Sequence, residues 1–214
     1  MILSLERGIY LASRSPRRRE LLAQIGVRFH LLLFRDRPGE AVDVDESTFG
    51  GEAADAYVER MARTKAEVGW QRMVQRNLPR APVLSADTTV ALHAKIFGKP
   101  NDREDAAAML GALSGTTHEV LTAVALKTDD ALQSVVSRSE VKFKALTPAE
   151  IAAYVESGEC DDKAGAYAIQ GRAARFIVEL RGSYSGVVGL PLYETAMLLE
   201  RIALPARGQA AARR

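Results

Sequence analysis

Four arginines and two serines crowd one short stretch near the amino end of the chain. The segment Ser13-Arg14-Ser15-Pro16-Arg17-Arg18-Arg19 follows an apolar run, and Ser15 and Pro16 are typical of a helix N-cap and first helical position. Amide N–H groups at a helix start lack intrahelical partners and lie at the positive end of the dipole. Because arginines there oppose the dipole, we favour a site for phosphate, and for polyphosphate in particular, over a solvated basic turn.

A second candidate centre is Ser85-Ala86-Asp87-Thr88-Thr89, which we place at the end of an apolar strand over residues 83–86. Ligands gather beyond the carboxyl ends of strands in open α/β sheets, so Asp87 could hold a metal ion or a water there. An aspartate that caps a loop is an equal alternative. Asp43, Asp45 and Glu46 could join Asp87 around a hard divalent cation, which prefers oxygen ligands, although most acidic loops are only solvated.

The third candidate is the stretch 161–171, whose glycines and alanines let the backbone approach a ligand closely. The amide of Gln170 can donate and accept at one edge, which suits the ring imide of thymine or uracil. A glutamine that bridges two backbone groups is the alternative. Cys160 has no histidine nearby in the sequence, so a buried thiol is favoured over a nucleophile, and the histidines show no metal-ligand spacing.

Composition limits the class of protein. The chain has 214 residues with 29 basic and 27 acidic side chains, a net charge of +2, which argues against a protein that coats nucleic acid or an anionic membrane. No apolar run is long enough to span a membrane, and the first residues do not resemble a signal peptide. A single cysteine cannot form an internal disulfide. We therefore expect a cytoplasmic protein without a membrane or nucleic-acid partner.

The apolar patterns predict an α/β fold with a mixed sheet. We expect strands at 9–12, 27–34, 83–86, 89–92, 95–97, 120–126, 135–143 and 176–180. We expect helices from residue 16 to about 25, around 57–66, from 102 to 113, from 147 to about 157 and from 191 to about 203. The Ser-rich stretch 183–189 is a tight loop at a cleft or only a turn. Residues 205–214 hold arginines but little apolar surface, so we expect a disordered tail.

Taken together, these segments resemble the Maf family of nucleotide pyrophosphatases. The resemblance runs from residue 9 to about 203. It rests on 11–18, Ser85-Ala86-Asp87-Thr88, Phe97-Gly98-Lys99-Pro100, Leu113-Ser114-Gly115, His118, 162–167, Ile169-Gln170-Gly171 and Val188-Gly189-Leu190-Pro191. The fold implied is an elongated mixed sheet in two lobes around a deep cleft, similar to the inosine triphosphate pyrophosphatases, in a single domain over residues 1–204.

The resemblance also implies the chemistry. Family members hydrolyse nucleoside triphosphates between the α and β phosphates with a divalent metal, magnesium or manganese. By this likeness Asp87 accepts a proton from the attacking water, and Glu46 joins it at the metal site. The resemblance assigns the stabilisation of transition-state charge to basic residues. Among these, the assignment of Lys65 rests on the loosest alignment. Those residues are Lys65, Lys99, Arg14 and Arg17, and Ser13 joins the substrate site.

Three positions divide the family by substrate. The branch acting on dTTP and UTP has arginine after the serine-proline pair, threonine after the catalytic aspartate and glutamine in the glycine-bounded stretch. Arg17, Thr88 and Gln170 match it. We therefore expect a dTTP/UTP pyrophosphatase, with modified pyrimidine triphosphates as further substrates. The alternatives are the 7-methyl-GTP branch and a non-catalytic nucleotide-binding regulator of cell division. Nucleic-acid binding through the arginines ranks last, and a homodimer is left open.

Overall fold

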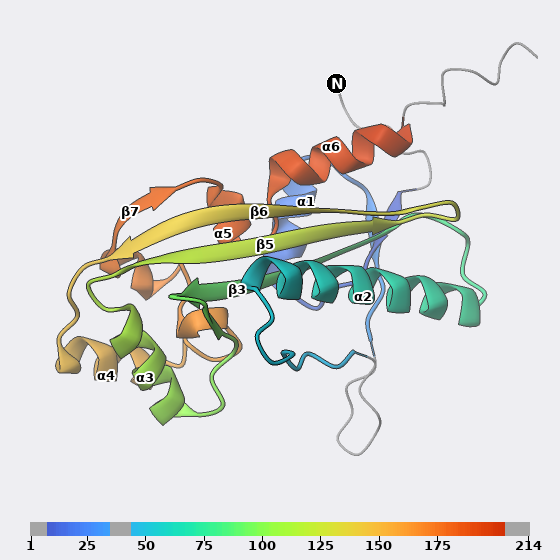
Figure 1. The fold of residues 1–214 in the computed structure, drawn as a ribbon. Helices are drawn as coiled ribbons and strands as arrows, with labels where there is room; N and C mark the ends of the chain where they lie inside the picture. Colours follow the sequence, from blue (N-terminus) through green and yellow to red (C-terminus); the bar gives the residue numbers. More distant parts are fainter. Residues whose placement is uncertain (1–7, 35–43, 204–214) are drawn as a thin grey trace, which may run out of the picture.

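A computed structural model describes residues 8–34 and 44–203 of the chain. Its strands form one mixed sheet in the order β2-β1-β3-β5-β6-β7, with β4 paired to β3 alone (Figure 1). The strands are β1 (Ile9–Leu11), β2 (Phe29–Leu31), β3 (Val83–Leu92), β4 (Lys95–Phe97), β5 (Thr117–Lys127), β6 (Leu132–Phe143) and β7 (Ile177–Arg181). β1 pairs in parallel with β2 and β3, and the other pairs are antiparallel. The predicted mixed α/β class is confirmed.

Helices cover both faces of this sheet. They are α1 (Pro16–Gln24), α2 (Ala54–Gln75), α3 (Arg103–Leu113), α4 (Pro148–Glu156), α5 (Tyr184–Val188) and α6 (Leu192–Ala203), with short 3₁₀ turns at Ala164–Ala166 and Arg172–Phe176. In Figure 1, α2 lies along one face, α1 and α6 lie on the other, and α3 and α4 gather at one end. The predicted helices are therefore all present, and the Ser-rich stretch forms a short helix rather than only a turn.

The central strand β5 explains why two layers of helix are needed. Successive side chains of a strand point to opposite faces. Leu121, Ala123 and Ala125 pack against α2, whereas Val124 and Leu126 pack with α1 and α6 on the other face. Because β5 is apolar on both faces, each face requires a helical cover.

Side-chain caps set the beginnings of two helices. Asp102 accepts a hydrogen bond from the Asp105 amide at the start of α3. Thr147 and Glu150 form a reciprocal capping box at the start of α4, immediately before Pro148. Such caps satisfy amides that have no partner inside the helix, so local sequence suffices to place these boundaries.

The strand that carries Asp87 differs from the prediction. β3 is one continuous strand from Val83 to Leu92, because β5 pairs with it without a break from Val83 to Ala91. Asp87 lies opposite Ala123 in the middle of the strand, so the prediction that it follows the strand end is wrong. β2 is also shorter than the predicted 27–34, since only Phe29–Leu31 pair with β1.

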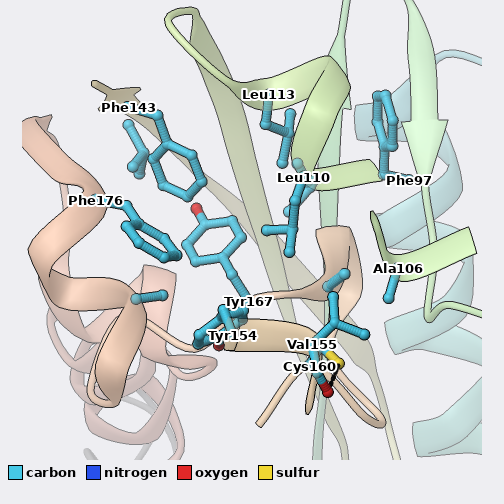
Figure 2. Close-up of a cluster of buried hydrophobic side chains, with 14 of the residues drawn as sticks. Phe97, Ala106, Leu110, Leu113, Phe143, Tyr154, Val155, Cys160, Tyr167 and Phe176 are labelled. Carbon is cyan, nitrogen blue, oxygen red and sulfur yellow. Dashed lines mark hydrogen bonds between the residues drawn. The ribbon is translucent and has the colours of Figure 1, made fainter. Parts of the chain in front are cut away.

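An aromatic cluster anchors the end of the molecule that holds α3 and α4 (Figure 2). The rings of Phe143 and Tyr167 meet edge to face at 4.8 Å between centroids, and Tyr154 meets Phe176 at 5.4 Å. Cys160 is buried beside this cluster as a free thiol, which agrees with the prediction. Edge-to-face ring contacts stabilise the fold beyond the contribution of the buried apolar area. They hold the segment 164–176 against the core.

Two predictions fall outside the described residues: the disordered tail at 205–214 and a part for Asp43 in the acidic loop. Within the described ranges, none of the helices combines the length and the apolar character that a membrane crossing requires.

Candidate active site

A single cavity collects the residues that the sequence singled out. Its volume is about 790 Å³. Its lining includes all nine predicted site residues, namely Ser13, Arg14, Arg17, Glu46, Lys65, Asp87, Thr88, Lys99 and Gln170. They come from the turn between β1 and α1, the first turn of α1, the loop before α2, α2 itself, β3, the turn after β4 and the stretch 162–170. Segments far apart in the sequence thus line one cavity.

Asp87 and Lys65 form an ion pair inside this cavity. Lys65 Nζ lies 2.5 Å from Asp87 Oδ1, and the Asp87 residue is only 9% exposed. The hydroxyl of Ser85 donates to the carbonyl oxygen of Ala62 at 2.6 Å, which ties α2 to β3 one helical turn before Lys65. A Cβ on Gly69 would lie 2.9 Å from Val83 Cγ1, so the glycine permits the close approach of helix and strand.

Glu46 shares the same lysine. Lys65 Nζ lies 2.7 Å from Glu46 Oε1, and Lys99 Nζ lies 3.8 Å from Oε2. Burial alone raises the pKa of Glu46, but Lys65 and Lys99 outweigh it, so its pKa is below the ordinary value. Tyr57 Oη donates to the Glu46 carbonyl oxygen at 2.9 Å and fixes the loop at this point.

The loop that carries Glu46 is clamped by Arg60 on α2. The guanidinium of Arg60 donates to both carboxylate oxygens of Glu52, at 2.7 and 2.6 Å, and to the Ser47 carbonyl oxygen at 3.1 Å. The ring of Phe49 lies 4.1 Å from the guanidinium carbon. Bidentate pairing and ring stacking are both strengths of arginine, so this clamp determines where Glu46 enters the cavity.

The donor set fits a divalent cation that is shared with a substrate. Asp87 and Glu46 both reach Lys65 Nζ, so their carboxylates converge on one point. Asp45 lines the cavity too, but its Oδ1 accepts the Ser47 amide at 2.9 Å. The described part of the chain has no cluster of three or more His, Cys, Asp or Glu that could hold a metal by itself. Magnesium is usually held by one or two carboxylates plus substrate phosphates, and two converging carboxylates suit that arrangement.

The arginines near the start of α1 differ in their exposure and in their hydrogen bonds. Arg14 is exposed, and its Nη2 donates to the Phe34 carbonyl oxygen at 2.7 Å. Arg17 Nε is buried and finds no hydrogen-bond partner among the described residues. Burial lowers the pKa of Arg17. A buried donor without an acceptor is costly, so an anion in the cavity would relieve this atom.

Arg18 also lines the cavity, although the sequence singles it out only as part of the arginine-rich stretch. Its Nε donates to the Gly189 carbonyl oxygen at 2.7 Å, and its Nη2 donates to Thr88 Oγ1 at 3.1 Å. Burial lowers the pKa of Arg18, and nearby Asp87 partly offsets this. A side chain on the first helical turn leans back toward the helix start, and this direction is the signal that could have found it.

Gln170 reaches the cavity from a stretch that is tied down at several points. Gly165 has φ +68°, and a Cβ there would lie 2.8 Å from Val90 Cγ2, so only glycine fits against β3. The Ala168 amide donates to Tyr154 Oη at 3.1 Å, and Tyr167 Oη lies 2.9 Å from His118 Nε2. Gln170 is exposed, and none of the side chains or backbone groups of the described ranges hydrogen-bonds its amide.

This arrangement defines a class of protein: a mixed α/β fold whose cavity is lined by two carboxylates and a group of lysines and arginines, a pattern of charges that suits a polyphosphate ligand. The chain belongs to the Maf-like protein family, whose profile matches residues 8–202.

Relatives of similar length support this assignment. The chain is 58% identical over 202 residues to a dTTP/UTP pyrophosphatase of Aromatoleum aromaticum, covering 94% of this chain and 98% of the relative. It is 55% identical over 192 residues to a dTTP/UTP pyrophosphatase of Nitrosomonas europaea, covering 90% and 93%. Among solved structures, the Staphylococcus aureus Ham1 protein is similar at 12% identity and a TM-score of 0.42, over 63% of this chain and 71% of that one.

Proposed function

We propose that this protein hydrolyses dTTP and UTP to the nucleoside monophosphate and pyrophosphate. The observation that carries the proposal is the convergence of Asp87, Glu46 and Lys65 on one point of a cavity that arginines also line. Relatives named dTTP/UTP pyrophosphatase, 52–58% identical to this chain, support the substrate class. The match of Arg17, Thr88 and Gln170 to the pyrimidine branch supports it independently.

In the proposed mechanism, the Asp87 carboxylate accepts a proton from the water that attacks the α-phosphorus. A new P–O bond forms to this water oxygen, and the bond from the α-phosphorus to the oxygen that bridges to the β-phosphorus breaks. That oxygen leaves as part of pyrophosphate. Little covalent help is needed, since such reactions depend on positioning and on charge stabilisation. Asp87 lies inside β3 and is paired on one side by β5, so its carboxylate has a rigid base.

Cations of the cavity take up the charge that develops on the phosphates. Lys65 and Lys99 flank the two carboxylates, and Arg17 and Arg18 approach from α1. Ser13 and Arg14 complete the rim beside the helix start. Glu46 and Asp87 would hold a divalent cation, magnesium or manganese. When bound, this cation neutralises phosphate charge and favours ionisation of water.

Gln170 is the group that we assign to the base. Its amide carries one acceptor and two donors, which can pair with the imide N–H and an adjacent carbonyl of thymine or uracil. Both bases share this edge, and this accounts for a site that accepts dTTP and UTP alike. The contacts of Gly165, Tyr167 and Ala168 fix the position, relative to β3, of the backbone that carries Gln170.

We further propose that residues 1–204 act as one domain, with 205–214 outside it, and that the protein works in the cytoplasm. The single sheet supports the first statement. The buried, unpaired thiol of Cys160 supports the second, because a reducing compartment preserves it.

A panel of nucleoside triphosphates tests the function. Release of pyrophosphate is measured with magnesium and with manganese for dTTP, UTP, dCTP, GTP and 7-methyl-GTP. We expect turnover of dTTP and UTP well above the others. A preference for 7-methyl-GTP would assign the chain to the other branch. Binding of dTTP without any turnover would favour the regulator that only binds nucleotides.

A further inference from the structure

We propose that Thr122 is a positioning residue of this active site, acting through the Thr88 hydroxyl to orient the guanidinium of Arg18 toward the triphosphate. The inference rests on the proposed function in one respect only, because it takes a triphosphate as the occupant of the cavity. Thr122 does not line the cavity, and it is buried beneath it at 1% exposure.

The sheet brings the two threonines together. Thr88 on β3 and Thr122 on β5 are direct partners in the antiparallel register. Side chains of such partners lie on the same face and close to one another. Their hydroxyl oxygens are 3.0 Å apart, and Arg18 Nη2 lies 3.1 Å from Thr88 Oγ1 on the cavity side.

The direction of the hydrogen bonds follows from proton counting. Thr122 Oγ1 donates to the carbonyl oxygen of Gly186 at 2.7 Å. A hydroxyl has one proton, so Thr122 can only accept from Thr88. Thr88 then donates its own proton to Thr122 and turns a lone pair toward Arg18. The chain runs one way, from Arg18 through Thr88 and Thr122 to Gly186.

Arg18 requires such an acceptor because few other groups hold it. Its Nε donates to the Gly189 carbonyl oxygen at 2.7 Å, and its Nη1 is 3.5 Å from Ser13 Oγ. Among the described residues, these contacts and Thr88 use three of the five N–H bonds of the guanidinium. The other two are left for oxygens in the cavity. The three acceptors are neutral, so they fix the orientation of the guanidinium without cancelling its charge.

The same contacts join α5 to the site. Gly186 lies in α5 and Gly189 is its C-cap residue. The carbonyl oxygen of Gly186 accepts from Thr122, and that of Gly189 accepts from Arg18. A purely structural role for Thr122, as a link between β5 and α5, predicts a loss of stability without a change in phosphate binding. Positioning predicts weaker binding of the triphosphate. The two interpretations can be separated.

The experiment compares Thr122→Val, Thr122→Ser and Thr195→Val with the wild type. Thr195 is a matched control, because it is fully buried and donates to the Pro191 carbonyl oxygen at the same 2.7 Å, at the start of α6. We expect Thr122→Val to lower kcat/KM for dTTP and UTP by about tenfold, which is at the upper end of the contribution of a hydrogen bond between neutral groups. We expect Thr122→Ser to restore it and Thr195→Val to change only stability.

A double-mutant cycle tests the route through Thr88. If Thr122 acts through Thr88, then Thr88→Val with Thr122→Val has the same kcat/KM as Thr88→Val alone, within about twofold. Additive losses would overturn the proposal. So would a folded Thr122→Val variant with wild-type kinetics, or a Thr122→Ser variant that fails to recover.

Calorimetry with inorganic tripolyphosphate makes the test independent of turnover. This probe carries the triphosphate charge but no base. We expect its affinity to fall by about tenfold in Thr122→Val and to remain unchanged in Thr195→Val. Equal affinities in wild type and Thr122→Val would overturn the positioning role. If the wild type binds tripolyphosphate but releases no pyrophosphate from any triphosphate, the proposed function fails while this comparison still decides the part of Thr122.

Discussion

Lys65 on α2 places its ammonium nitrogen 2.5 Å from Oδ1 of Asp87 on β3. The same nitrogen lies 2.7 Å from Oε1 of Glu46, so one cation holds two carboxylates that would otherwise repel each other. A triphosphate with its divalent cation presents the same mixture of charges to the site. The ion pairs therefore hold the two carboxylates together at the point where we propose that the divalent cation binds.

Replacing Glu46 by Gln tests the metal site. We expect the magnesium or manganese concentration for half-maximal activity to rise by about 10- to 100-fold, since one anionic oxygen ligand is lost. Titration of the metal at fixed dTTP measures it. Glu67→Gln is the matched control, because Glu67 pairs with Lys127 away from the active-site cavity. An unchanged metal requirement in Glu46→Gln would remove Glu46 from the metal site.

Replacing Gln170 by Ala tests recognition of the base. We expect kcat/KM for dTTP and UTP to fall by about 10- to 100-fold through loss of one or two hydrogen bonds, with little change in tripolyphosphate affinity. Gln71→Ala serves as control, because Gln71 is an exposed residue of α2 that does not line the active-site cavity. A Gln170→Ala variant that loses tripolyphosphate and dTTP equally would indicate damage to the phosphate site instead.

Replacing Gly165 by Ala tests the stretch that carries Gln170. Its positive φ and the contact with Val90 predict a loss of about 1–3 kcal/mol in the free energy of unfolding. Gly111→Ala on α3 has open space around its Cβ and should gain about 0.5–1 kcal/mol. Urea unfolding of both variants measures the difference. Equal stability would mean that Gly165 is not required against β3.

Acid should destabilise the protein through His118. Burial lowers the pKa of His118 to about 4, below its ordinary 6.5, so the unfolded chain binds the proton more tightly than the folded one. The contribution of His118 to the free energy of unfolding is fully present above about pH 6.5. It decreases as the pH falls toward about 4 and is lost below that pH. The loss amounts to about 3 kcal/mol over this interval.

Urea unfolding across the same interval measures this loss in the wild type and in His118→Phe. The variant lacks the titrating ring. Over this pH interval, its free energy of unfolding should therefore decrease by about 3 kcal/mol less than that of the wild type. An identical pH dependence in wild type and His118→Phe would exclude His118 as the source.

Much of the fold could be predicted because its signals are local. The caps at Asp102 and Thr147 and the β-branched runs of β5 and β6 depend on neighbouring residues only. The continuity of β3 could not be predicted in this way, because the polar Asp87-Thr88-Thr89 interrupts its apolar pattern. Pairing with β5, more than thirty residues away in the chain, overrides that interruption.

The same difference between local signals and long-range contacts applies to the site residues. Asp87 and Gln170 were singled out from their local sequence before the family resemblance assigned their roles, and both line the cavity together with Lys65. The sequence placed Arg18 in the arginine-rich stretch without a contact of its own and did not point to Thr122, because the contacts that join β3, β5, α1 and α5 at these residues form only in the folded chain. Arg60 escaped notice for the same reason, since its clamp on the Glu46 loop depends on a helix and a loop meeting in space.

Pyrophosphate release from dTTP by Asp87→Asn is the most direct test of the account. Asparagine keeps the shape of the side chain but cannot accept the proton of water, so we expect kcat to fall by about 10²- to 10⁴-fold while dTTP still binds. Asp129→Asn, on an exposed pair with Arg80, should retain wild-type activity. A folded Asp87→Asn protein that turns over dTTP at the wild-type rate would contradict the central claim that Asp87 is the catalytic base.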